Sequence, residues 1–261
     1  MSERTSYAPG TPCWVDLETP NIEGAAAFYE GLLGWQVPEL PNSAELGGYR
    51  RAKKDGADVA GVMPLMQEGQ PPAWSSYVSV EDAAATAAAV KAAGGGVIAE
   101  PMDVMDLGKM AIFTDPTGAV FGIWQPGAFA GAARVNEPGA LAWNELNTRD
   151  TGAAKAFYGA VFGWGFEDHD MGEMGIYTEW KLGDAPIGGM MDIGSTQMPA
   201  EVPAHWLVYF AVENADAAVE KVKSSGGNIA FGPIDIPAGR FAVVTDPFGA
   251  AFSVIQMPEG S

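Results

Sequence analysis

The chain has 261 residues, and its 33 acidic residues against 14 basic ones give a formal net charge of −19. This charge disfavours nucleic acids and anionic lipid surfaces as partners, because both are negatively charged themselves. No stretch reaches the roughly eighteen apolar residues of a membrane span, and the beginning lacks a signal-peptide pattern, so we expect a cytoplasmic protein. The single cysteine, Cys13, excludes an internal disulfide framework, and we expect it to be a buried structural thiol.

The first predicted elements are a strand, a helix and several short strands. Residues 13–19, CWVDLET, are typical of a strand, and Asn21 is placed to cap a helix that ends at Gly34. Short strands are then expected from Trp35 and through residues 49–53 and 57–65.

The same order of elements then starts again. Residues 75–80 are typical of a strand, Asp82 caps an alanine-rich helix, and short strands follow up to residues 117–125. The second half of the chain repeats both series, with Asp150 and Asn214 as the helix caps.

Three segments recur along the chain. AAAFYEGLLGW (25–35) returns as AKAFYGAVFGW (154–164), WSSYVSVEDA (74–83) loosely as WLVYFAVENA (206–215), and TDPTGAVFGIWQ (114–125) as TDPFGAAFSVIQ (245–256). The offsets of 129, 132 and 131 residues predict a tandem duplication. Since each half holds the strand–helix–strands series twice, we predict an α+β fold of four βαβββ modules, with mixed sheets that carry helices on one face. A segment rich in Gly, Pro and Ala, 126–140, separates a first domain, 1–128, from a second, 129–261.

The AFY…GW opening after each capped helix start, the DP-x-GA-x-F hairpin that closes each half, and the four-module count resemble the vicinal oxygen chelate superfamily. This superfamily includes glyoxalase I, extradiol dioxygenases and bleomycin-resistance proteins. The greatest likeness is to two-domain glyoxalase-like proteins of actinobacteria, and it covers the chain from about Gly10 to Gln256. The resemblance implies curved sheets that form cups, each with a divalent metal held by His or Gln from early strands and Glu from late ones.

The residues at the expected ligand positions are poor metal ligands. The early positions hold Trp14, Ser75, Trp143 and Leu207, and the late positions hold Gly122 and Ser253. We therefore predict no metal and no other cofactor.

Two histidines complete the candidates for a displaced metal site. His205 lies on the same strand face as one ligand position, so a site built from His205 and Glu145 is left open, although an ordinary hydrogen-bonded histidine is the favoured interpretation. His169 lies in the polar segment 166–175, where we expect a turn that exposes it to solvent.

Strand alternation predicts an aromatic cup in each half. The predicted substrate-binding residues are Trp14, Asp16, Tyr77 and Trp124 in the first half and Trp143, Glu145 and Tyr209 in the second. The two tryptophans either fill the space that a metal takes in relatives or form walls on which a flat organic ligand stacks.

Two functions remain in view. The favoured hypothesis is a metal-free protein that binds an aromatic small molecule, such as a natural product or an antibiotic, for sequestration or delivery. The alternative is an enzyme, either a glyoxalase-like lyase or isomerase or an oxidoreductase of the hydroxylase or dioxygenase type. It would use a displaced metal or acid–base chemistry by Asp16, Glu145 and Tyr209. The pairing of the modules and the oligomeric state, including a homodimer, are left open.

Overall fold

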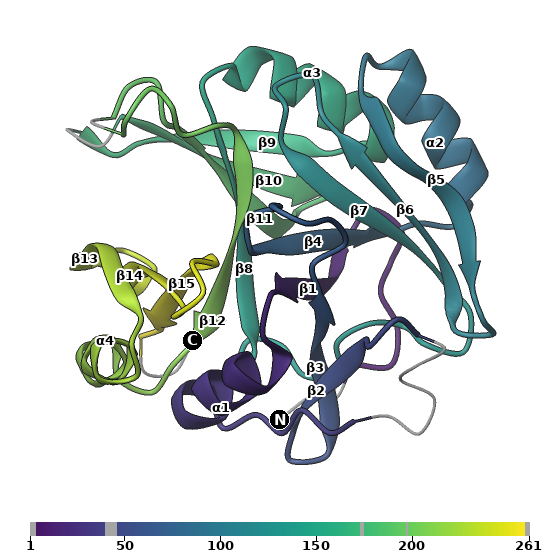
Figure 1. The fold of residues 1–261 in the computed structure, drawn as a ribbon. Coiled ribbons are helices and arrows are strands. Elements are labelled where there is room, and N and C mark those ends of the chain that lie inside the picture. Colours follow the sequence, from purple (N-terminus) through teal and green to yellow (C-terminus); the bar gives the residue numbers. More distant parts are fainter. Residues whose placement is uncertain (1–3, 40–45, 173–174, 197, 259–261) are drawn as a thin grey trace.

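The computed structural model describes residues 4–39, 46–172, 175–196 and 198–258, and these residues form four helices and fifteen strands (Figure 1). The first half contains β1 (Pro12–Thr19), α1 (Ile22–Leu33), β2 (Arg50–Lys54), β3 (Ala57–Pro64), β4 (Ala73–Ser79), α2 (Ala83–Ala92), β5 (Gly96–Val104), β6 (Gly108–Thr114) and β7 (Val120–Pro126). The second half contains β8 (Leu141–Thr148), α3 (Thr151–Phe162), β9 (Gly165–Asp170), β10 (Ile176–Leu182), β11 (Ala185–Asp192), β12 (His205–Ala211), α4 (Ala215–Ser224), β13 (Asn228–Ile236), β14 (Gly239–Thr245) and β15 (Ala251–Gln256).

Each helix begins directly after its predicted cap. The side chains of Asn21, Asp82, Asp150 and Asn214 accept hydrogen bonds from backbone N–H groups of the first helical turn. These bonds satisfy donors that have no partner within the helix, and so fix the register in which each helix starts.

Each half builds one mixed sheet, which confirms the predicted α+β class. The first sheet has the order β2-β3-β1-β4-β7-β6-β5, and the second has the order β13-β14-β15-β12-β8-β11-β10-β9. In both sheets the opening strands of the two modules pair antiparallel, β1 with β4 and β8 with β12. The modules therefore share sheets within a half, which answers the question that the sequence left open.

One predicted strand is wrong. The segment from Trp35 forms a single bridge, between Gln36 and Lys53, and no regular strand among the described residues up to position 39. The Trp35 side chain is fully buried, and its indole N–H donates to the Gly139 carbonyl at 2.7 Å. Trp35 is therefore part of the hydrophobic core. Pro38 follows and has no N–H for a ladder.

The two halves pack through their helix-bearing faces and share two cores. One core combines α1 and strand residues of the first half with α4 and strand residues of the second, and the other combines α2 with α3. Figure 1 shows α2 and α3 next to each other, and they are in direct contact. Among the described residues, no helix covers the opposite face of either sheet.

Among the residues that the structure describes, none of the helices has both the length and the apolar character required to cross a membrane. The predicted domain boundary after residue 128 stays a prediction. The segment that follows it packs on the first half, through Phe129 and Ala132.

Candidate functional site

The helix-free face of each sheet carries the predicted site residues. Val15 and Leu17 of β1 lie in the core beneath the helices, so Trp14 and Asp16 project from the other side. We call the helix-free surface of the first sheet, around Trp14, Asp16 and Tyr77, the first face. We call the corresponding surface of the second sheet, around Trp143, Glu145 and Tyr209, the second face.

Glu145 lies at the centre of the second face with only 7% of its surface exposed. Asn147 donates a hydrogen bond of 3.4 Å to its carboxylate, and the hydroxyls of Tyr209 and Tyr177 lie close enough to lower its pKa. The Tyr177 hydroxyl also accepts a hydrogen bond of 2.8 Å from the Trp143 indole. The Trp143 indole, the Tyr177 hydroxyl and the Glu145 carboxylate thus lie next to one another.

A glycine on the neighbouring strand leaves room for the side chains of Tyr177 and Trp143. A Cβ atom on Gly189 of β11 would lie 1.8 Å from the Tyr177 hydroxyl oxygen and 2.9 Å from the Trp143 indole nitrogen. Any side chain at this position would therefore displace the tyrosine from the carboxylate.

The first face repeats the arrangement. Oδ1 of Asp16 accepts hydrogen bonds of 2.7 Å from both the Trp14 indole and the Tyr49 hydroxyl, and the Tyr77 hydroxyl lies close enough to lower its pKa. A Cβ on Gly61 would lie 1.8 Å from the same oxygen. Each half therefore holds a Trp, a carboxylate, two Tyr and a Gly in equivalent places.

Two of these tyrosines were not among the predicted site residues. Tyr49 and Tyr177 lie 128 residues apart, as do Gly61 and Gly189, so the repeat offset was the signal that could have found them. Tyr49 directly precedes β2 and Tyr177 lies in β10. These strands lie two positions away from β1 and β8 in the sheets, and only the strand order brings the hydroxyls to the carboxylates.

Burial controls the protonation of both carboxylates. It raises the pKa of Glu145 to about 7 and that of Asp16 to about 6, against the opposing effect of the hydrogen bonds that they accept. Burial also raises the pKa values of Tyr177 and Tyr209 well above the usual one, so both remain hydroxyl donors. A carboxyl group with a pKa near 7 can accept or donate a proton at neutral pH.

The two faces differ in how far they are covered. Trp14, Tyr77 and Trp124 are all less than 9% exposed and form a buried cluster with Phe129. Trp143 is half-buried, although Tyr209 beside it is buried. The second face is therefore the more accessible of the two at its tryptophan.

The metal positions of the resembled superfamily do not fit a metal here. A Cβ on Gly122 would lie 2.3 Å from the Tyr77 ring, so an aromatic ring takes the space of a late ligand. Tryptophan at positions 14 and 143 offers an indole N–H, which donates and does not coordinate. The side chains at these positions therefore offer no ligand set for a metal.

The prediction for His169 was wrong. It lies in β9, paired with Tyr177 of β10, and not in a turn. The polar composition of FEDHD suggested a turn, but β9 is the edge strand of the sheet, where both faces can carry polar side chains.

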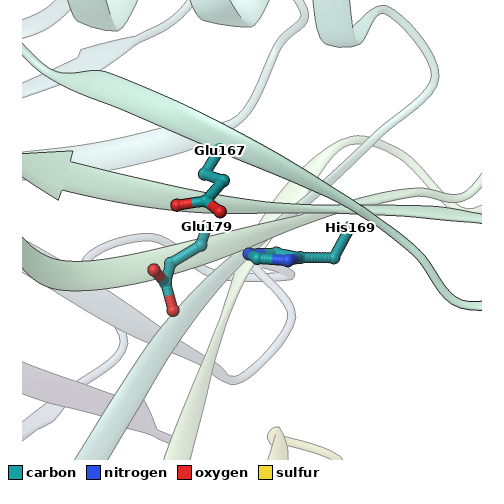
Figure 2. Close-up of side chains that lie close together, drawn as sticks. All are labelled: Glu167, His169 and Glu179. Carbon is teal, nitrogen blue, oxygen red and sulfur yellow. The ribbon is translucent and has the colours of Figure 1, made fainter.

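His169 lies close to Glu167 and Glu179 (Figure 2), with one potential ligand atom from each residue within 4.8 Å of the others. Atoms bound to one ion at about 2.1 Å lie roughly 3 to 3.5 Å apart, so these side chains would have to move closer to bind one. Lys181 already pairs with Glu167, and its Nζ lies 3.6 Å from Glu179. The absence of a metal stays a prediction.

His205 was the other histidine considered as a metal ligand. Its Nδ1 lies 2.9 Å from the Pro203 carbonyl oxygen, and burial lowers its pKa. Within the described ranges it is not part of any group of three ligand-bearing side chains.

A small cavity lies between the halves and not on either face. Its volume is about 10 Å³, and Ser76, Asn144, Tyr158 and Trp206 are among its lining residues. This is the size of a single water molecule, so the cavity excludes an organic ligand.

Comparison with known proteins shows the family to which the chain belongs. The Glyoxalase/Bleomycin resistance protein/Dioxygenase superfamily matches residues 14–123 and 140–254. CFP32 of Mycobacterium tuberculosis, named as a glyoxylase, is 43% identical over 260 residues, which cover 98% of each chain. The anthracycline biosynthesis protein DnrV of Streptomyces peucetius is 39% identical over 271 residues, with coverage of 98% of this chain and 96% of the relative.

A solved structure extends the comparison to the fold. The Mn(II)-bound glyoxalase from Novosphingobium aromaticivorans superposes with a TM-score of 0.66 at 18% identity, over 98% of this chain and 83% of that one. At this identity the likeness concerns the fold alone.

Proposed function

Since the chain belongs to the Glyoxalase/Bleomycin resistance protein/Dioxygenase superfamily, we propose that it binds a flat aromatic small molecule on its second face. Trp143 provides the stacking surface, and Glu145 with its two tyrosines receives the polar end of the ligand. Trp14, Asp16, Tyr77 and Trp124 are the corresponding residues of the first face. We further propose that the protein acts in the cytoplasm and needs no metal for binding.

The observation that carries this proposal is the half-buried indole of Trp143 beside the buried Glu145 carboxylate. A partly exposed indole offers a large apolar surface, and aromatic contacts on it stabilise a complex beyond the area that they bury. The hydroxyls of Tyr177 and Tyr209, which lie beside this carboxylate, can orient a hydroxyl or carbonyl group of the ligand.

The relatives support an aromatic ligand. DnrV and DauV are named for the biosynthesis of anthracyclines, which are flat polycyclic aromatic compounds, and both match 98% of this chain. An aromatic polyketide or a similar ring system is therefore the ligand class that we propose.

One observation favours a second function. A carboxyl group with a pKa of about 7, next to the hydroxyls of two tyrosines, has the protonation behaviour of a general acid–base. In this second proposal Glu145 takes a proton from the bound substrate and returns it at another atom, as a lyase or isomerase requires. Turnover with a bell-shaped or sigmoidal pH dependence centred near 7 would favour the enzyme over the binding protein.

Isothermal titration with a soluble hydroxyanthraquinone tests the binding proposal. We expect Trp143→Ala to weaken binding by about 1 to 3 kcal/mol, roughly five- to 150-fold. Phe166→Ala is the matched control, since Phe166 is a 50% exposed aromatic of the same sheet and pairs in register with Trp180, which faces the helices. Equal affinity for the wild type and Trp143→Ala, with both folded, would overturn the proposal.

A further inference from the structure

The segment that joins the halves crosses the first face and places Phe129 on Trp14. The two rings meet edge to face, with centroids 4.9 Å apart and planes at 89°. The Trp124 indole donates a hydrogen bond of 2.8 Å to the Phe129 carbonyl. The Cζ atom of the Arg51 guanidinium lies over the Phe129 ring, 5.4 Å from its centroid.

The backbone of this segment is held in place on both sides of Phe129. The N–H of Phe129 donates to the Leu107 carbonyl at 3.1 Å, and the N–H of Ala132 donates to the Cys13 carbonyl at 2.9 Å. Gly131 has a φ of +128°, and a Cβ there would lie 2.4 Å from the Cys13 carbonyl oxygen, so only glycine allows this approach. The ring is thus a fixed part of the first face.

Among the described residues, no aromatic ring contacts that of Trp143, although Phe241 packs on Tyr209 with ring centroids 5.9 Å apart. When Gln125 is aligned with Gln256, the residue that corresponds to Phe129 is Gly260. The side chain of Trp143 remains half-buried where that of Trp14 is 4% exposed.

The charges that β2 brings to the first face also differ from those that β10 brings to the second. On the first face, Arg51 and Lys53 pair with the single anion Asp58. At the places of Arg51 and Lys53, the second face has Glu179 and Lys181, which lie in register with Gly189 and Pro186. Glu167 of β9 lies beside Glu179 (Figure 2). Two carboxylates there surround a single lysine.

We infer that Phe129 is an internal substitute for the ligand on the first face, and that the ligand of the second face carries an aromatic ring at the equivalent place with a cationic amino group towards Glu179. This inference rests on the proposed binding function and deepens it. It follows that the wild type binds one ligand per chain, and that removal of the Phe129 ring opens a second site of opposite charge preference.

The test uses two probes of one shape, an anthraquinone with an aminoalkyl side chain and an anthraquinone sulfonate, in isothermal titrations. We expect the wild type to bind the amine at one site and the sulfonate at least tenfold more weakly. Phe129→Ala should gain one site for the sulfonate, whereas Phe129→Leu, which keeps the first face filled, should behave as the wild type.

A second variant makes the test independent of the folding of Phe129→Ala. Glu179→Gln should weaken amine binding about two- to fivefold, as expected for a partly exposed charge contact, and should leave sulfonate binding unchanged or stronger. Equal affinity of the wild type for both probes, or no added site in folded Phe129→Ala, would overturn the inference. Loss of binding in Trp143→Ala would still support the proposed function in that case.

Discussion

The Tyr158 hydroxyl of α3 donates a hydrogen bond of 3.0 Å to Asp115, which lies in the other half of the chain. In the same way, the Tyr29 hydroxyl of α1, in the first half, donates a hydrogen bond of 3.3 Å to Asp246 of the second half. The tyrosine belongs to the repeated AFY motif and the aspartate to the repeated DP-x-G motif, so the two motifs bind each other across the junction. Because both motifs occur in each half, this tyrosine–aspartate contact forms twice and holds the two halves together.

We expect Tyr158→Phe to lower the free energy of unfolding by about 2 kcal/mol. The substitution leaves the buried Asp115 without this donor and also leaves the Trp206 indole, 2.9 Å from the hydroxyl, without its acceptor. Chemical denaturation measures the change. Ligand affinity on the second face should remain at the wild-type value, and a loss of affinity with unchanged stability would contradict this role.

Gly189→Ala should abolish the arrangement of the second face, because its Cβ would overlap the Tyr177 hydroxyl. We expect at least a tenfold loss of aromatic-ligand affinity and a lower melting temperature. Gly165→Ala is the matched control in the same sheet, since the nearest heavy atom to its Cβ would lie 3.9 Å away. Equal affinity of both variants would show that the position of Tyr177 does not matter for binding.

Glu145→Gln should remove a pH-dependent loss of stability. Burial raises the pKa of Glu145 from the usual 4.5 to about 7, so between these values the folded chain retains a proton that the unfolded chain releases. The free energy of unfolding of the wild type therefore falls as the pH rises from about 4.5 to 7, by up to about 3 kcal/mol from this group, and levels off above.

The neutral glutamine does not undergo this change. The free energy of unfolding of Glu145→Gln relative to the wild type should therefore increase between about pH 5 and pH 8, as measured by urea denaturation. The exposed Glu201→Gln serves as the control for loss of a charge. A difference that stays constant with pH would contradict the raised pKa.

Replacement of Trp14 should lower the stability more than replacement of Trp143. Trp14→Ala should lower the free energy of unfolding by about 3 to 5 kcal/mol, because Trp14 is 4% exposed and packs against Phe129. Trp143→Ala should lower it by less, since Trp143 is half-buried. Equal, large losses in both variants would indicate that both tryptophans fill the core.

The sequence was sufficient to predict the fold for definite physical reasons. Asn21, Asp82, Asp150 and Asn214 are good helix caps, and the alternation of residues such as Val15 and Leu17 with Trp14 and Asp16 follows the two-residue period of a strand. The strand from Trp35 was predicted wrongly because Trp35 turns into the core, a tertiary contact with Gly139 that no local pattern reveals.

The site was predictable only in part. Residues on β1, β4, β8 and β12 could be assigned to a face by counting from the helix caps. Tyr49, directly before β2, and Tyr177, in β10, reach the carboxylates only through the sheet order, which the sequence left open. His169 was misassigned because a polar edge strand and a polar turn have similar compositions.

The most direct test of the central claim is the indole N–H signal of Trp143 in a nitrogen–hydrogen correlation spectrum, assigned with Trp143→Phe. We predict that titration with the aminoalkyl anthraquinone shifts this signal and leaves that of Trp14 unchanged, because the Trp143 indole donates to Tyr177 on the more accessible face and Trp14 is covered by Phe129. A saturable shift of Trp14 with no change at Trp143 would contradict the account.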